Sequence, residues 1–186
     1  MRVWPIVVAL SCLAASARAD QAPKELPKDR VGFDGMFVLP VDTYGEDADA
    51  GIGGLVRYER RIGSKLHLTA RGGPLFHAAS TNGHSLTMLL ALVGMRYNLD
   101  PDRESGTFFS MAIGMNYVRI SAEGEGVKAT DAEPELTLDI GGGFQVRRVQ
   151  VRGSIFFTPH VGASFGGDSV SYLGMAVTIG YDFVVR

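Results

Sequence analysis

The chain has 186 residues, including 24 glycines and a single cysteine, and its formal net charge is −2. This length fits one domain, and the balance of charge excludes the basic footprint of a nucleic-acid-binding protein. Beyond the first residues the chain has no apolar run of about 18 residues, which excludes a transmembrane helix there.

The N-terminal segment 1–19 predicts a secretory signal peptide. Arg2 gives it a positive start, Val3–Ala15 is an apolar run too short to span a bilayer, and Ala17-Arg18-Ala19 is a small-x-small cleavage site. Cys12 raises the alternative of a lipidated N-terminus, although the residues before it fit that pattern poorly. Cleavage after residue 19 would leave no cysteine and therefore no disulfide.

Residues 20–29 are polar and carry two prolines, and we expect them to form a short flexible lead before one domain at 30–186. In that domain apolar and polar residues alternate with the period of two that is typical of β-strands. The alternation predicts eight strands, near residues 31–39, 52–60, 65–75, 86–99, 109–117, 136–145, 149–157 and 172–186. We expect polar loops at 42–50, 76–85, 123–133 and 158–169, and shorter turns at 62–64, 100–106 and 147–148.

The last predicted strand shows the alternation clearly. One face carries large apolar residues and the other carries small or polar residues and one carboxylate, that of Asp182. The interior of an eight-stranded barrel has room only for side chains, so the glycine-rich polar faces belong inside and the Phe, Tyr and Met faces point outward, toward lipid. The alternatives are a soluble lipocalin-like barrel and a β-sandwich, which would bury the apolar face.

Four short segments carry a resemblance to a known family: Gly94-Met-Arg-Tyr97, Ile113-Gly-Met-Asn-Tyr117, Gly141-Gly-Gly-Phe144 and Gly180-Tyr-Asp-Phe183. With these segments in order behind a signal peptide, the chain resembles the OmpA-like small outer-membrane β-barrels. The resemblance implies an all-β fold, an eight-stranded antiparallel up-and-down transmembrane β-barrel, in the outer membrane of a Gram-negative cell envelope. It also implies a structural or cell-surface role.

The end of the chain is similar to the C-terminal insertion signal of such barrels. The matching residues are Thr178, Gly180, Phe183 and Val185, although the usual final aromatic residue is replaced by Arg186. This similarity implies the barrel-assembly machinery as a partner.

Charged residues recur on the faces that we expect to line the lumen. They are Asp34, Arg57, Glu59, Arg71, Arg96, Asp139, Arg152 and Asp182, joined by His67. Because buried charges must pair, we expect a lumen plugged by ion pairs. The alternative is a narrow channel for small solutes.

A less favoured alternative is an enzyme that modifies lipid A, since barrel enzymes of that kind use a His and a Ser. The candidates are His77, Ser80, His84, Ser85 and His160, all expected near the outer loops. Adjacent strand residues such as His84 and Ser85 point to opposite faces, and the histidines lack paired metal-ligand spacing. We therefore expect no enzyme activity, no cofactor and no metal.

The alternation of long and short connections predicts the orientation of the barrel. An even strand count with a secreted N-terminus puts both termini and the short turns in the periplasm, and the long acidic loops outside. Outer-membrane lipids and lipopolysaccharide are the expected partners. Divalent cations would bridge the acidic loops to lipopolysaccharide phosphates, and we expect a monomer.

Overall fold

The computed structural model describes residues 28–41, 48–79, 84–100, 105–124, 127–161 and 170–185. They form eight antiparallel strands in a closed barrel, in which each strand pairs with its sequence neighbours and β1 closes on β8. The strands are β1 (Asp29–Val41), β2 (Ala48–Arg61), β3 (Leu66–Ala79), β4 (His84–Asn98), β5 (Ser105–Gly124), β6 (Val127–Val146), β7 (Val149–Val161) and β8 (Val170–Val185). The predicted eight-stranded up-and-down barrel is confirmed.

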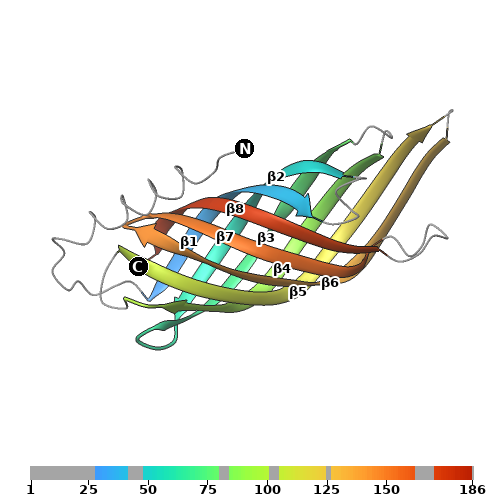
Figure 1. Cartoon of the computed structure of the whole chain (residues 1–186). Coiled ribbons are helices and arrows are strands. Elements are labelled where there is room, and N and C mark those ends of the chain that lie inside the picture. Colours follow the sequence, from blue (N-terminus) through green and yellow to red (C-terminus); the bar gives the residue numbers. More distant parts are fainter. Residues whose placement is uncertain are drawn as a thin grey trace.

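The strands tilt around the barrel, as Figure 1 shows. We call the end that carries the start of β1, the end of β8 and the connections after β2, β4 and β6 the turn end. The opposite end, with the connections after β1, β3, β5 and β7, is the loop end. The seam between β1 and β8 is fully paired, from Asp29 opposite Val185 to Val41 opposite Leu173, so closure leaves no free edge along this seam.

Several strands extend further toward the loop end than the sequence indicates. The largest error concerns the predicted loop at 123–133. There β5 and β6 continue as a paired ladder up to Gly124 opposite Val127, and they project beyond the other strands (Figure 1). Beyond Tyr117 the outward positions become polar, as at Arg119, and apolar side chains such as Val118 turn inward. The outward apolar face by which the strands were recognised therefore ends before the strands do.

The other three predicted loops are also shorter in the structure. The predicted loop at 76–85 begins too early, because Phe76–Ala79 belongs to β3 and β4 starts at His84. The last residues of the predicted loop at 42–50 belong to β2, and the first residues of the predicted loop at 158–169 belong to β7. At the turn end β1 starts at Asp29, one residue before the expected domain boundary, and pairs there with Arg60.

The tight turn between β6 and β7 is made by Arg147 and Arg148. Arg147 has φ 53°, in the left-handed region that two-residue hairpins require. Its backbone N–H donates to Ser105 Oγ at 3.3 Å, and its carbonyl accepts from Gln145 Nε2 at 2.8 Å. These two bonds anchor the turn to the barrel end without a glycine.

Candidate functional site

The candidate site is the interior of the barrel, where alternate residues of all eight strands meet. All eight charged residues that the sequence places on the inner faces are buried there. Their exposed fractions are Asp34 2%, Arg57 2%, Glu59 3%, Arg71 7%, Arg96 3%, Asp139 4%, Arg152 4% and Asp182 2%. The structure brings them together in two clusters that lie at different heights in the barrel.

The first cluster lies at the turn end and centres on Arg57 of β2. Its Nε donates to both carboxylate oxygens of Asp34, at 3.1 and 3.0 Å, and its Nη2 donates to Asp182 Oδ1 at 2.6 Å. Its Nη1 lies 2.8 Å from Glu59 Oε1, an ion pair without the alignment of a hydrogen bond. One guanidinium therefore joins carboxylates from β1, β2 and β8.

Arg96 of β4 extends this cluster across the lumen. Its Nη1 donates to Glu59 Oε2 at 3.2 Å and to Gln150 Oε1 at 3.0 Å, and its Nη2 donates to Gln145 Oε1 at 2.5 Å. The guanidinium also lies over the Phe108 ring, with Cζ 3.8 Å from the ring centroid. Such stacking suits the planar guanidinium.

Three further residues, which were not among the predicted lumen charges, complete this cluster: Arg30, Gln145 and Gln150. Arg30 lies 3.6 Å from Asp182 Oδ2 and donates to Gln145 Oε1 at 3.2 Å. Gln145 donates to Asp182 Oδ2 at 2.9 Å, and Gln150 donates to Asp34 Oδ1 at 3.2 Å. Arg30 faces the same side of β1 as Asp34. A predicted strand that began at residue 29, as β1 does, would therefore have placed Arg30 in the lumen as well.

The second cluster lies further into the barrel and contains three charges. Arg71 Nη2 donates to Asp139 Oδ1 at 3.2 Å, and Arg152 Nη2 donates to the same oxygen. Arg152 Nη1 reaches Asp139 Oδ2 at 3.3 Å, and its Nε donates to Ser110 Oγ at 2.8 Å. The side chain of Arg71 crosses the lumen from β3 to β6 to make this contact.

Toward the loop end the interior becomes apolar. Its buried cluster comprises Met36, Val38, Leu55, Leu75, Leu86, Met88, Leu90, Val118, Phe156, Tyr172 and Ala176. The sequence had indicated this only on the strand near 86–99, where both faces carry apolar residues. The lumen is therefore lined by ion pairs at one end and by packed hydrocarbon at the other.

His77 lies inside this apolar region, 4% exposed, and not in a loop as the sequence had suggested. Its Nδ1 lies 2.8 Å from the backbone oxygen of Asp49, and its Nε2 lies 3.1 Å from the Tyr172 hydroxyl. Neither partner is a serine. His77 therefore forms a polar link between β3 and β8. Ser80 and the side chains of His84, Ser85 and His160 lie outside the described residues.

The described residues were also compared with two kinds of site, a metal centre and a membrane-spanning helix. No group of three or more His, Cys, Asp or Glu side chains there is arranged to hold a metal ion. No helix in the described part of the chain is long and apolar enough to cross a membrane.

The four residues that resemble an insertion signal have different surroundings. Thr178 is buried and donates to the Arg152 carbonyl at 3.4 Å, and Gly180 lies against the Asp34 carboxylate. Phe183 is 55% exposed and packs edge-on against Tyr181, with ring centroids 5.2 Å apart. The backbone of Val185 pairs with Asp29. The two inward residues thus contact the lumen clusters.

Comparison with known proteins identifies the fold. No family model and no curated protein matches the chain. Among solved structures, Neisserial surface protein A is 12% identical, with a TM-score of 0.56 and coverage of 85% of this chain and 97% of that chain. Ail, the attachment invasion locus protein of Yersinia pestis, is 12% identical, with a TM-score of 0.57 and coverage of 83% and 96%.

A third structure is the N-terminal β-barrel domain of Pseudomonas aeruginosa OprF, 9% identical with a TM-score of 0.56, and the match covers 85% of this chain and all of that domain. At these identities the likeness concerns the backbone, and it agrees with the closed antiparallel topology and the outward apolar faces. The chain therefore has the fold of the small eight-stranded outer-membrane β-barrels, as its resemblance to the OmpA-like family implies.

Proposed function

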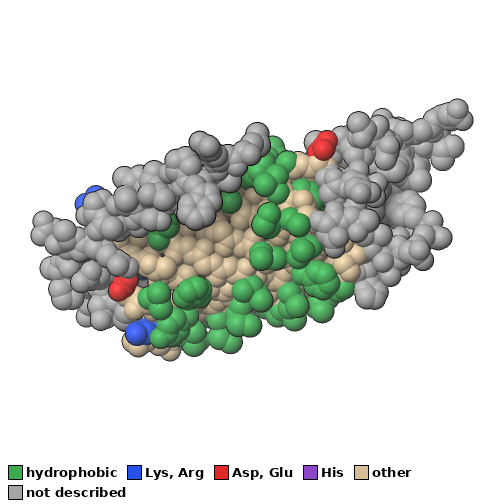
Figure 2. All heavy atoms as spheres, viewed as in Figure 1, with side chains coloured by type: hydrophobic (Ala, Val, Ile, Leu, Met, Phe, Trp, Pro, Cys, Tyr) green, Lys and Arg blue, Asp and Glu red, His purple; other side chains and the backbone are tan. Residues whose placement is uncertain are grey.

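We propose that the protein is an integral outer-membrane barrel with a structural or cell-surface role and a closed lumen. The observation that carries this proposal is the reversal of polarity between the two sides of the wall. Charged side chains are buried inside, while large apolar side chains such as Ile52, Met111 and Ile140 are between 62% and 65% exposed outside. Figure 2 shows apolar side chains distributed over the visible barrel wall.

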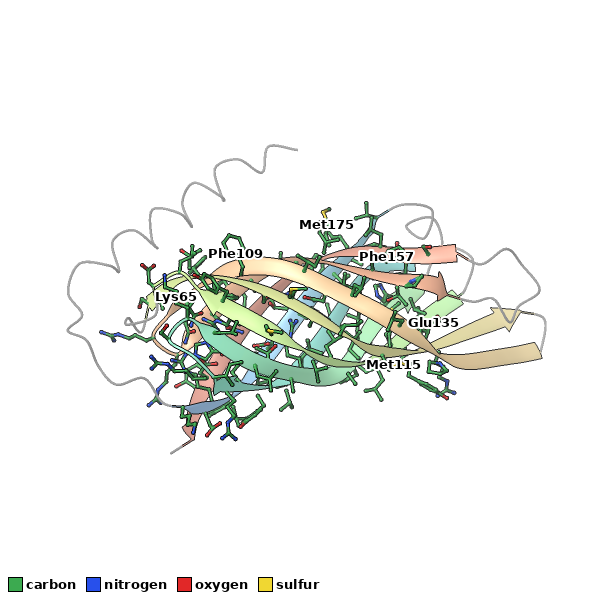
Figure 3. The ribbon with its side chains drawn as sticks, turned by 90° about the horizontal axis from the view of Figure 1, so that it is seen from below. Lys65, Phe109, Met115, Glu135, Phe157 and Met175 are labelled. Carbon is green, nitrogen blue, oxygen red and sulfur yellow. The ribbon has the colours of Figure 1, made fainter. Side chains whose placement is uncertain are left out.

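The outward aromatic residues support a bilayer as the surroundings. Near the turn end lie Tyr58, Tyr97, Phe109, Tyr181 and Phe183, and near the loop end lie Phe37, Phe76, Tyr117 and Phe157, all at least 37% exposed. Aliphatic residues such as Val93 and Ile113 occupy the wall between them. Aromatic girdles on both sides of an apolar band are the pattern of outer-membrane barrels. Figure 3 shows Phe109, Met115 and Met175 along the outside of the ribbon.

The filling of the interior supports a closed lumen over a narrow channel. Arg57 is 2% exposed in a network that reaches three neighbouring strands, and the apolar cluster closes the loop end. A hydrated path would have to cross both layers. Water is held in a protein interior where polar groups bind it, and the apolar cluster offers few such groups, so this layer is the stronger barrier.

The proposed location is tested by cell fractionation. The protein should be recovered with outer membranes, and it should migrate differently on gels with and without boiling, because closed barrels resist detergent unfolding. Recovery in the soluble periplasmic fraction, with no effect of heat on migration, would contradict the proposal. Lipid-A acyl-chain analysis after expression tests the enzyme alternative, and we expect no change.

The proposal includes partners that follow from this location. Lipids and lipopolysaccharide would cover the apolar wall and its outer rim, and the barrel-assembly machinery would insert the chain through its last strand. Signal-peptide cleavage after Ala19 belongs to the same proposal, and N-terminal sequencing of the mature protein tests it.

A further inference from the structure

The two charge clusters of the lumen differ in their charge balance. In the turn-end cluster Arg30, Arg57 and Arg96 face Asp34, Glu59 and Asp182, so positive and negative groups are equal in number. In the second cluster Arg71 and Arg152 share the single carboxylate of Asp139. In the described part of the chain, two guanidinium charges of this cluster therefore share one carboxylate charge.

This surplus lies in the barrel interior and not at a wet surface. The side chains of Arg71, Arg152 and Asp139 are 5%, 4% and 6% exposed. Both arginines donate to the same oxygen, Asp139 Oδ1, so the two guanidinium groups lie beside each other. Two like charges this close, with one carboxylate between them, are costly in a medium of low dielectric constant.

Two nearby carboxylates, Asp34 and Glu59, are already engaged by the turn-end cluster. Asp34 accepts from Arg57 and Gln150, and Glu59 accepts from Arg96 and contacts Arg57. Glu135 has the inward phase of Asp139 but lies four residues further along β6, which is about 13 Å of strand rise. Its substitution by Gln, described below, tests whether it acts as a counter-charge.

A buried hydroxyl next to the cluster has no hydrogen-bond partner. Ser154 is 8% exposed, and its Oγ is unsatisfied. A Cβ added at Gly141 would lie 2.6 Å from Ser154 Cβ and 2.8 Å from Arg152 Nη2. The serine and the guanidinium therefore meet over the same glycine. Buried hydroxyls are normally paired, so an orphan donor beside surplus positive charge indicates a missing acceptor.

We propose that Arg71, Arg152 and Ser154 form a binding site for one small monovalent anion of the halide class, within the lumen beside Asp139. The anion would balance the extra guanidinium charge and accept the hydrogen bond that Ser154 Oγ has to donate. Ser110 already accepts from Arg152 Nε and holds that side chain in place. This inference concerns the folded barrel and does not depend on its role in the cell.

Equilibrium unfolding by urea in lipid vesicles tests the site, with sodium chloride exchanged for sodium gluconate at constant ionic strength. Gluconate is too large to enter the cluster. We expect chloride to stabilise the barrel in a saturable manner, so that above its dissociation constant each tenfold rise in chloride raises the folding constant by up to tenfold. Equal stability in the two salts would overturn the proposal.

Variants locate the effect. Arg71→Gln removes the surplus charge and should abolish the chloride dependence, and Ser154→Ala should weaken chloride affinity by about tenfold through loss of one charge-assisted hydrogen bond. Ser154→Ala keeps every charge, so it still tests the site if Arg71→Gln does not fold. Arg30→Gln, in the balanced cluster, should keep the dependence. A chloride dependence that persists unchanged in both Arg71→Gln and Ser154→Ala would overturn the site.

Two further measurements decide between an anion and a protein carboxylate. Bromide carries an anomalous X-ray signal, so crystals grown in sodium bromide should show a peak beside Arg71, Arg152 and Ser154. Glu135→Gln should leave the chloride dependence unchanged. If this variant instead acquires a chloride dependence that the natural protein lacks, Glu135 is the neutralising group and the proposal is wrong.

Discussion

Arg57 donates through Nε to both carboxylate oxygens of Asp34, from β2 to the neighbouring β1, at 3.1 and 3.0 Å. The same guanidinium binds Asp182 on β8, which is the other neighbour of β1. The hydrogen bonds of Arg57 therefore span the seam where the first and last strands pair. Closure and charge pairing depend on the same side chain.

Replacement of Arg57 by Met should destabilise the barrel strongly. The variant leaves Asp34 and Asp182 buried without their main partner, and loss of one member of a buried pair costs about 3–5 kcal/mol. Urea unfolding in lipid vesicles measures the change in the free energy of unfolding. The control is Arg60→Met, because Arg60 is half exposed and lies 4.0 Å from Asp29, where a surface pair contributes about 0–1 kcal/mol. Similar losses in the two variants would contradict the central place of Arg57.

Gly180→Ala should destabilise the barrel through the same carboxylate. A Cβ at this position would collide with Asp34 Oδ1 and would lie 3.0 Å from Gln150 Cγ. We expect a loss of about 1–3 kcal/mol, as for other overpacked sites. Gly153→Ala is the matched control, since a Cβ there meets no heavy atom within 4 Å, and its stability should be unchanged or slightly higher.

This pair of variants also separates two roles of Gly180. The sequence similarity assigns it to an insertion signal, whereas the structure shows it packed on Asp34. Unassisted refolding into vesicles involves no assembly machinery. If Gly180→Ala refolds with full stability in vesicles but fails to assemble in cells, recognition of the last strand explains the glycine, and packing does not.

The strand period alone placed the charged residues inside the barrel, because alternate residues of a strand must face the same side. It did not give their partners. Arg71 reaches Asp139 across the lumen, 68 positions along the chain, and such a contact depends on barrel registry and side-chain length. The extended hairpin of β5 and β6 was missed because the outward apolar face ends at Tyr117: beyond it Val118 is buried and Arg119 is exposed. His77 was misplaced because its strand was ended too early.

The unmodified protein should show no steady conductance in planar lipid bilayers. Met88 and Tyr172 are both fully buried in the apolar cluster at the loop end, so their joint replacement by Ala should open a small, steady conductance by removing packed hydrocarbon. Met175→Ala is the control, because Met175 is 50% exposed on the outer wall (Figure 3). Steady conductance of the unmodified protein would favour the narrow channel for small solutes.

The orientation of the barrel gives the last prediction. Because the strands alternate in direction, the connections after β1 and β5 lie at the loop end, and the connection after β4 lies at the turn end with the start of β1 and the end of β8. A cleaved signal peptide leaves the start of β1 in the periplasm, so the loop end must face outward. This argument uses strand count and not charge.

An epitope tag inserted after Tyr44 or after Gly126 should therefore bind antibody on intact cells, since loops at the outer end tolerate insertions. A tag inserted after Arg103 should bind antibody only after the outer membrane is permeabilised. Equal whole-cell amounts of folded protein, judged by its gel migration without boiling, exclude differences in expression. Labelling of the Arg103 tag on intact cells, without labelling of the other two, would show that the barrel is inverted. The prediction that a cleaved signal peptide leaves the start of β1 in the periplasm would then be wrong.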